Sequence, residues 1–513
     1  MVSTVYSAGL NGVDGYVVTV ECSGFDRLSD FELVGLPDAA VKEAKERVRS
    51  ACENSGIRFP HLDLMVNLAP AHLKKEGSGF DLAILCSVLQ CAGVIPSAKD
   101  LSKVCMVGEL SLSGEVRPIN GVLSMALAAR DAGLTYIYVP AANAREAGVV
   151  DGLTVYPLKN LGQFLDHLAG KCEIEPVRYD MRQFIHDVHN YSEDFSDVRG
   201  QSAAKRALEI AAAGGHNVLL IGPPGSGKSM LAKRLPSILP DLTFEEALET
   251  TKIHSVMGLL RQDLMCTRPF RAPHHSVSLV GMVGGGINPR PGELSLAHNG
   301  VLFLDELPEL PKATSEALRQ PLEDGQVTVI RAAARLTFPS RFMLVGAMNP
   351  CRCGYYGDPS HACTCSFRDV EKYLGRVSGP MLDRMDIQTE VPAVSYAEIS
   401  DKKPTGDSSA VIRERVNAAR AFARARLERA GEKFVTNAAM SVSQLRKYCV
   451  LDEEASEILR AAFEELNLSA RGHDRILRVA RTIADLDGSE NIGALHIAEA
   501  IRYRSLDRKY WKR

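Results

Sequence analysis

The chain has 513 residues, enough for about three domains with sizeable cores. Hydrophobic residues make up 45% and charged residues 24%, an ordinary globular composition, and a net charge of −3 predicts no general attraction to nucleic acid or membranes. No apolar run reaches the roughly 20 residues that a membrane span needs, and the first residues lack an export signal. We therefore expect a cytoplasmic protein without a membrane partner.

Residues 1–168 alternate strand-like and helical patterns, which indicates an α/β layout. The polar residues 169–196 that follow show little periodicity and are predicted to be a linker. The predicted strands cover residues 15–21, 31–34, 64–68, 103–107 and 136–139, and the predicted helices cover 39–55 and 80–91.

The stretch GELSLSGEVRPINGVL, residues 108–123, predicts two short strands around a tight turn and then a helix. This wording is similar to the proteolytic domain of Lon, an α+β domain whose serine nucleophile is activated by a lysine. Leu123 stands where that lysine is expected, Ser78 is off register, and Lys74 and Lys75 lie just upstream of Ser78. We expect an accessory domain with this fold but without peptidase chemistry, which assists assembly or DNA binding.

Residues 222–229, GPPGSGKS, match the phosphate-loop pattern G-x-x-x-x-G-K-[ST] between a buried strand and a helix. Glycines allow backbone N–H groups to surround phosphate oxygens at the helix N-terminus. We predict that Lys228 reaches the β- and γ-phosphates of ATP and that Ser229 holds Mg²⁺. The predicted phosphate-binding residues are Gly222, Pro223, Pro224, Gly225, Ser226, Gly227, Lys228 and Ser229.

Two further apolar runs, VLFLDE and MLVGAMN, predict buried strands of a parallel sheet with crossover helices. The first run ends on Asp305, which is expected to reach the Mg²⁺, and Glu306, which is expected to polarise the attacking water. The second ends on Asn349, which either orients the same water or serves as a turn residue before Pro350.

Several phrases are distinctive, including RPFRAPHHSVSLVGMVGGG, RPGELSLAHNGVLFLDELPE, AMNPC and SGPMLDRMDI. They resemble, essentially from end to end, the YifB/ComM family of magnesium-chelatase-like AAA+ ATPases. The resemblance implies a phosphate-loop α/β core of the helix-2-insert branch at residues 197–395 and an all-α lid at 396–513. It also implies a ring, with six identical chains as the family expectation.

The resemblance extends to individual residues. Arg384 matches the arginine finger that reaches the γ-phosphate of a neighbouring subunit, unless it pairs with Asp383 or Asp386 of its own chain. Arg471 matches the sensor arginine of the lid, with Arg475 as the alternative. The segment expected to pack on the adenine contains Val198, Gly200 and Gln201.

Two inserts are expected to face the pore of the ring. One is glycine-rich and contains His274 and His275; the other, residues 326–341, predicts a hairpin. Their arginines are expected either to contact DNA phosphates, displacing counterions, or to pair with acids of the neighbouring subunit. The candidate DNA-binding residues are Arg271, Arg290, Arg331 and Arg335.

By resemblance, the function is an ATP-driven motor for branch migration or unwinding in recombination or natural transformation. The alternative is remodelling of a protein partner.

Of the twelve cysteines, eight are scattered and four form C-x-C-x9-C-x-C within residues 351–365. Four thiolates at about 2.3 Å from one tetrahedral Zn²⁺ would fix this Gly/Pro-rich loop. Unliganded or redox-active thiols are the alternative, and His361 is a candidate to replace one ligand. The candidate ligands are Cys351, Cys353, Cys363 and Cys365.

Overall fold

The protein, a computed structural model, is described at residues 2–26, 30–95, 100–180, 184, 191–286, 288–331, 334–394, 406–466 and 468–511. It divides into two compact units. Unit 1 combines Met1–His186 with Phe244–Cys266, and unit 2 combines Asp187–Thr243 with Thr267–Arg513.

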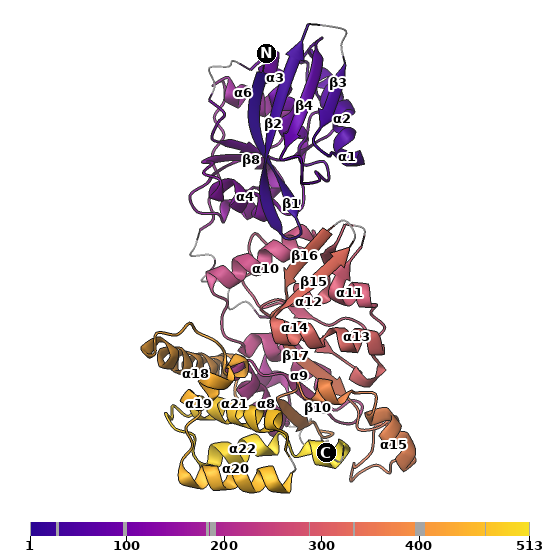
Figure 1. Cartoon of the computed structure of the whole chain (residues 1–513), viewed down its shortest axis with the longest axis vertical. Helices are drawn as coiled ribbons and strands as arrows, with labels where there is room; N and C mark the ends of the chain where they lie inside the picture. The colour runs from indigo at the N-terminus through magenta and orange to yellow at the C-terminus, as the bar shows by residue number, and fades with distance from the viewer. Residues whose placement is uncertain are drawn as a thin grey trace. The chain divides into compact units, whose positions relative to one another are not determined.

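Unit 1 is built on a mixed seven-stranded sheet with the order β3-β4-β2-β1-β5-β8-β9 (Figure 1). β2 pairs antiparallel with β1 and β4, and the other neighbours are parallel. The strands are β1 (Val2–Asn11), β2 (Asp14–Phe25), β3 (Phe31–Val34), β4 (Asp63–Ala69), β5 (Val104–Met106), β8 (Tyr136–Pro140) and β9 (Thr154–Leu158). All five predicted strands of this region are therefore present.

The helices of unit 1 bury apolar side chains on this sheet, and α3 is buried over nearly its whole length, in agreement with its mostly apolar sequence. The predicted helix over residues 39–55 is divided at Glu43. The predicted turn at 108–123 is present as paired strands β6 (Glu109–Leu110) and β7 (Val116–Arg117) before α4. The helices are α1 (Ala39–Lys42), α2 (Ala44–Asn54), α3 (Asp81–Cys91), α4 (Val122–Asp131), α5 (Ala144–Gly148) and α6 (Leu161–Leu168).

A segment from the middle of the chain also belongs to unit 1. Helix α10 (Phe244–Val256) packs on α4. Ser255 donates a hydrogen bond to Glu146, and Lys252 Nζ lies 2.6 Å from Asp14 Oδ1. Residues 244–266 were expected within the 197–395 core, but they fold with the N-terminal part of the chain. The sequence did not predict this, because long-range contacts leave no local signal.

The segment predicted as a linker also departs from its expected form. Val177 forms an isolated antiparallel bridge to Val155, and the N–H of Tyr179 donates to the carbonyl of Gly148. This stretch is therefore part of unit 1. Residues 181–183 and 185–190, and the predicted boundary at 395–396, lie outside the described residues.

Unit 2 contains a parallel five-stranded sheet with the order β11-β14-β17-β10-β18. β10, β14 and β17 are wholly buried apolar runs, as expected for strands covered on both faces. Because the strands are parallel, residues that follow β10, β14 and β17 meet at one edge. The strands are β10 (Val218–Ile221), β11 (Phe270–Arg271), β14 (Val301–Leu304), β17 (Met343–Met348) and β18 (Ile387–Glu390).

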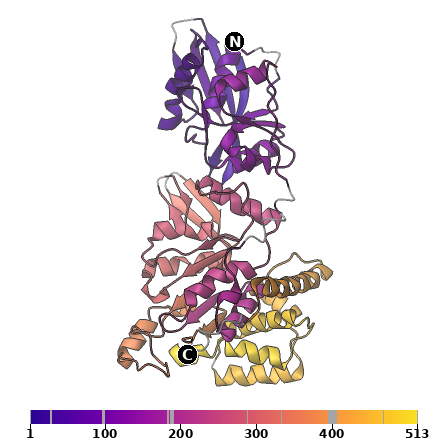
Figure 2. The ribbon, with the colours of Figure 1, turned by 180° about the vertical axis from the view of Figure 1, so that it is seen from behind.

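The C-terminal helices pack beside this sheet, with α18 and α21 against α8 (Figures 1 and 2). One apolar core includes residues of the sheet, α8, α18 and α21. The helices around the sheet are α8 (Ser202–Gly214), α9 (Lys228–Arg234), α13 (Lys312–Ala317), α14 (Arg319–Asp324), α15 (Phe367–Leu374) and α16 (Gly379–Leu382). The C-terminal helices are α18 (Ser409–Arg429), α19 (Val442–Tyr448), α20 (Glu453–Glu465), α21 (Ala470–Leu486), α22 (Ala494–Arg502) and α23 (Leu506–Trp511).

Two smaller inserts lie along the chain between strands of the unit 2 sheet. One contains α11 (Leu279–Val283), the paired strands β12 (Gly284–Gly285) and β13 (Arg290–Pro291), and α12 (Glu293–Leu296). The other is the predicted hairpin, β15 (Gln326–Arg331) paired antiparallel with β16 (Ala334–Pro339); its turn, residues 332–333, lies outside the described residues.

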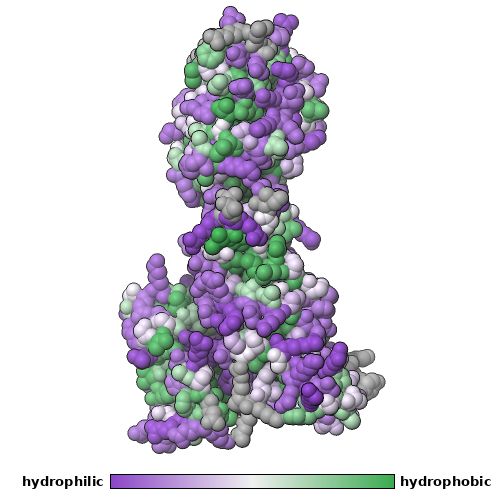
Figure 3. Space-filling model, turned by 45° about the vertical axis from the view of Figure 1, so that its right-hand side comes forward, coloured by the Kyte–Doolittle hydropathy of each residue, from purple (hydrophilic) through white to green (hydrophobic). Residues whose placement is uncertain are grey.

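Within the described ranges, no helix is both long enough and apolar enough to cross a membrane. On the face drawn in Figure 3, hydrophilic residues predominate and hydrophobic ones form smaller patches.

Candidate nucleotide site

The phosphate loop leaves β10 at the centre of the sheet and turns directly into α9. Gly227 has a φ of +94°, which a side chain would strongly disfavour, and it caps the N-terminus of α9. The N–H of Gly222 donates to the carbonyl of Met348, which fixes the start of the loop to β17. The loop therefore lies at the carboxyl edge of the sheet, where its helix N-terminus favours anions.

Lys228 lies folded over the loop. Its Nζ donates hydrogen bonds of 2.8 Å to the carbonyls of Gly222 and Pro223, and it lies 3.2 Å from Asn349 Oδ1. Burial lowers the pKa of Lys228 to about 8, although the nearby Asp305 opposes this shift. A bound phosphate would provide the strong negative charge that this ammonium lacks.

Ser229 and Asp305 present adjacent oxygen atoms. Ser229 Oγ donates to Asp305 Oδ2 at 2.8 Å. A hydroxyl and a carboxylate are the protein ligands that Mg²⁺ usually retains beside a nucleotide, so the residues fit this ion. The ends of β10, β14 and β17 thus bring four predicted residues together: Lys228, Ser229, Asp305 and Asn349.

Glu306 follows Asp305 and has an unexpected neighbour. Its backbone is left-handed, with a φ of +50°, and its side chain is half-exposed. His275 Nδ1 lies 2.9 Å from Glu306 Oε2, and the rings of His274 and His275 are 4.0 Å apart. Sequence reasoning placed both histidines on a DNA-facing insert, and only the paired histidines in RAPHHS hinted at a special role.

The segment before α8 also reaches the phosphate loop. Gly200 and Gln201 both have left-handed backbones. Gln201 Nε2 donates to the carbonyls of Ser226, at 3.2 Å, and Pro392, at 2.6 Å. The Val198 side chain is buried in the core, and its carbonyl accepts a bond from Lys205. Of these three predicted residues, Gln201 is thus the one seen to contact the phosphate loop.

Comparison with known proteins accounts for most of this chain. Residues 194–399 match the model of magnesium chelatase subunit ChlI, residues 18–143 match a second ChlI model, and 406–504 match the ChlI C-terminal model. The uncharacterized protein YifB of Salmonella typhimurium is 43% identical over 506 residues, covering 98% of this chain and 97% of that protein. Competence protein ComM of Haemophilus influenzae is 42% identical over 506 residues, with the same coverage. The chain belongs to the YifB/ComM family of magnesium-chelatase-like AAA+ ATPases.

Membership of the YifB/ComM family makes the chain an ATPase, with ATP and Mg²⁺ as its cofactors, in agreement with the residues at the sheet edge. A more limited similarity connects part of the chain with Lon. Lon protease of Rhizobium meliloti is 28% identical over 149 residues, which is 28% of this chain and 18% of that protein.

The two arginines matched to YifB/ComM family roles differ in their surroundings. Arg384 is largely buried and bonded within its own chain, to Glu323 and to the carbonyls of Pro380 and Arg319. The expected intrachain partners were Asp383 or Asp386, and the observed carboxylate instead comes from α14. Arg471 is exposed at the start of α21.

Arg475, the alternative sensor, is buried and has a structural partner. Its Nε lies 3.5 Å from Asp386 Oδ1. His216 Nδ1 lies 3.5 Å from Asp386 Oδ2, and the Asn217 N–H donates to the same carboxylate. Arg475 therefore connects the C-terminal helices to the sheet.

The four candidate DNA-binding arginines do not form one group. Arg271 lies on β11, where Nε and Nη2 each bond to a Glu293 oxygen at 2.7 Å, so we leave it out of any DNA surface. Arg290, Arg331 and Arg335 are exposed. An added Cβ on Gly285 would lie 3.1 Å from Arg331 Nη2, so the two inserts touch.

The cysteine cluster is assembled as expected. The sulfur atoms of Cys351, Cys353, Cys363 and Cys365 all lie within 4.8 Å of one another, and none forms a disulfide. His361 instead contacts Ser360 and stacks on Tyr355. The prediction that His361 might replace a cysteine is therefore not supported.

In unit 1, the residues considered for Lon-type chemistry are engaged separately. Lys75 is fully buried, and its ammonium donates to the carbonyls of Pro70 and Leu73. Ser78 donates to Glu109, and Leu123 is buried. The described contacts therefore do not pair Ser78 with a lysine.

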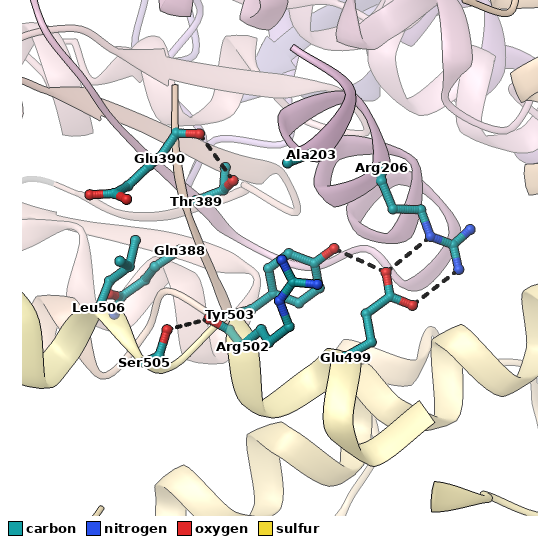
Figure 4. A pocket seen from close by; sticks show the side chains of 10 residues that line it. All are labelled: Ala203, Arg206, Gln388, Thr389, Glu390, Glu499, Arg502, Tyr503, Ser505 and Leu506. Atoms are coloured by element: carbon teal, nitrogen blue, oxygen red, sulfur yellow. Dashed lines mark hydrogen bonds and ion pairs between the residues drawn. The ribbon is translucent and has the colours of Figure 1, made fainter. Parts of the chain in front are cut away.

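A pocket of about 310 Å³ lies between α8, β18 and the C-terminal helices (Figure 4). Inside it, Arg206 pairs with Glu499, which also accepts a bond from the Tyr503 hydroxyl. Arg206 and Glu499 thus offset each other's charge, and the pocket shares no residue with the phosphate loop. We regard the sheet edge as the reactive site.

Proposed function

We propose that this protein is an ATP-driven ring motor that acts on DNA, by branch migration or unwinding, during recombination or natural transformation. The convergence of Lys228, Ser229, Asp305 and Asn349 supports the motor half of this proposal. The name of the Haemophilus relative, a competence protein, supports the setting. Work on chromosomal or incoming DNA would place the protein in the cytoplasm.

Each residue of the site has a proposed task. Lys228 and the N–H groups of residues 222–229 bind the phosphates of ATP, and Ser229 and Asp305 hold Mg²⁺, which supplies charge neutralisation when bound. Glu306 takes up the proton of the attacking water, and Asn349 orients that water. Val198, Gly200 and Gln201 form the border of the adenine site.

The proposed ring gives roles to two arginines, one that acts on a neighbouring chain and one in the lid. We assign Arg384 as the finger that stabilises negative charge on the phosphates bound to a neighbouring chain, and this requires its pair with Glu323 to open. Arg471, exposed at the N-terminal end of α21, is assigned as the lid sensor because Arg475 already serves Asp386. Six chains form the ring, as implied by the family.

The DNA surface is proposed on the two touching inserts. Arg290, Arg331 and Arg335 are exposed there, and each cation that contacts a phosphate releases a counterion. Unlike Arg271, none of these three has a described carboxylate partner. They therefore suit a surface that binds any sequence through its backbone.

The deciding experiment measures ATP hydrolysis by the purified full chain without DNA and with single-stranded, duplex and four-way-junction DNA. At least one form should stimulate hydrolysis. Changing Arg331 and Arg335 together to Gln should weaken DNA binding and reduce the slope of log K against log salt by about 2. Arg460→Gln, an exposed change on α20, is the matched control. Hydrolysis that no DNA form alters would contradict the DNA half of the proposal.

A second function, remodelling of a protein partner, is favoured by one feature of the same inserts. Leu279, Val280 and Ile330 have 45%, 50% and 67% of their surface exposed. Apolar side chains of this kind suit a protein surface better than a phosphate backbone. Hydrolysis stimulated by a purified protein and unaffected by DNA, and lost on changing Leu279 and Val280 to Ser, would establish this alternative.

A further inference from the structure

The cysteine loop is connected to the nucleotide site at two points. It begins at Cys351, two residues after Asn349, whose side chain is 3.2 Å from Lys228 Nζ. It also touches the phosphate loop itself, because a Cβ built on Gly354 would lie only 2.4 Å from Pro224 Cδ. Gly354 has a φ of +94°, so both its backbone and its contact with Pro224 require glycine.

The sulfur positions fit a tetrahedral metal. The distances are 3.3 Å between Cys351 and Cys353, 3.7 Å between Cys351 and Cys363, and 3.5 Å between Cys353 and Cys363. A regular tetrahedron with metal–sulfur bonds of about 2.3 Å has edges of about 3.8 Å. A disulfide would bring two sulfurs to about 2.05 Å, which is not seen here.

The loop also supplies the donors that normally surround metal-bound sulfur. The backbone N–H of Gly354 donates to the carbonyl of Cys351, and the backbone N–H groups of Tyr356, Tyr355 and Thr364 lie close to the sulfurs of Cys351 and Cys353. Such N–H groups orient thiolate ligands and offset their charge. Four sulfur ligands leave no open position, so the site suits a structural ion.

We propose that Cys351, Cys353, Cys363 and Cys365 bind one Zn²⁺ and that the loop fixed in this way supports the nucleotide site through Asn349 and Pro224. Removing the zinc releases the loop between the two cysteine pairs, because few apolar side chains hold this loop in place. Asn349 and the phosphate loop then lose a fixed neighbour, so ATP binds more weakly and is hydrolysed more slowly. The second half of this inference rests on the proposed ATPase chemistry, and the first half does not.

The metal itself is tested by elemental analysis of the full chain purified under reducing conditions without chelators. About one zinc per chain is expected, and the change of Cys363 and Cys365 together to Ser should abolish it. Cys172→Ser, an exposed cysteine outside the cluster, should leave the zinc content unchanged. Iron in place of zinc, or no metal in the unaltered chain, would overturn the proposal.

The supporting role is tested with Gly354→Ala, which retains all four thiols. This variant should keep its zinc while its affinity for a fluorescent ATP analogue falls about tenfold, because the new Cβ displaces Pro224. Normal ATP binding by zinc-loaded Gly354→Ala, and by the chain after reversible zinc removal, would refute the support role. If the zinc-loaded unaltered chain binds ATP but never hydrolyses it, the proposed function fails and the zinc site stands.

Discussion

The phosphate-loop edge of unit 2 and the 108–123 turn of unit 1 both carry phrases that resemble known catalytic domains, but they differ in what surrounds them. At the first, residues that follow three neighbouring strands contact one another, Lys228 with Asn349 and Ser229 with Asp305. At the second, Ser78 and Lys75 are each bonded to other groups, and Leu123, at the position where the resemblance to Lon implies a lysine, is buried. Side chains must contact one another before they can act together, and among the described residues the phosphate-loop edge shows such contacts.

The largest expected effect tests this comparison directly. Lys228→Ala should abolish ATP hydrolysis, because the only ammonium folded over the described phosphate loop is removed. Ser78→Ala should leave hydrolysis unchanged, and neither the variant nor the unaltered chain should cleave peptides. Peptide cleavage that Ser78→Ala removes would break the comparison.

Arg384→Ala should lower the rate of hydrolysis by about 10³-fold, the usual size of an arginine-finger effect. Arg376→Ala is the control, because Arg376 is likewise paired with a carboxylate of its own chain, Glu309, although it is more exposed than Arg384. Mixing the Arg384→Ala and Lys228→Ala chains should restore part of the activity, because each supplies what its neighbour lacks. A rate unaffected by Arg384→Ala would show that unit 2 works without a second chain.

Buried carboxylates provide a matched pair of changes in the two units. Asp386→Ala should lower the stability of unit 2 by about 3–5 kcal/mol, because it leaves Arg475 buried without its partner. Asp81→Ala should destabilise unit 1 comparably, since Arg47 bonds to both Asp81 oxygens. Calorimetry of thermal unfolding measures both, with Glu457→Gln on α20 as control, and hydrolysis should suffer more from the change at Asp386.

Acid should act on the same carboxylate. Burial alone would raise the pKa of Asp386, but His216, Arg475 and the Asn217 N–H together lower it below its ordinary value. Its contribution to stability is therefore complete above the unfolded value of about 3.9 and is lost as the pH falls through the lower folded value. Unfolding of unit 2 should shift to lower temperature below about pH 4, and Asp386→Ala should remove this part of the shift.

The smallest expected effect concerns His275. His275→Ala should lower kcat about tenfold, equivalent to about 1.4 kcal/mol, with little change in KM, because Glu306 loses the contact that orients it. His275→Asn, which can still donate a hydrogen bond, should recover part of the rate, and His274→Ala should have less effect. An increase in KM alone would place His275 in binding rather than in positioning.

The sequence predicts the parts of this molecule whose signals are local. Residues 222–229 determine the phosphate loop because glycine, lysine and serine occur in a fixed local order between a strand and a helix. The contact of His275 with Glu306 and the pairing of Arg271 with Glu293 were not predictable in this way. Both depend on how short segments, such as the two-residue strand β11, return to the sheet, and no periodicity specifies that.

The assignment of α10 to unit 1 has a practical result for truncation. The chain passes between the units near residues 186, 243 and 266, so cutting it once near 186 leaves two covalent connections. Expressing only residues 187–513 would strip α10 of the surface that covers Leu248 and Val256 and expose apolar area on the motor fragment. Unit 1 therefore cannot be removed by a single truncation. A fragment that begins at residue 187 should aggregate through the exposed apolar side chains of α10.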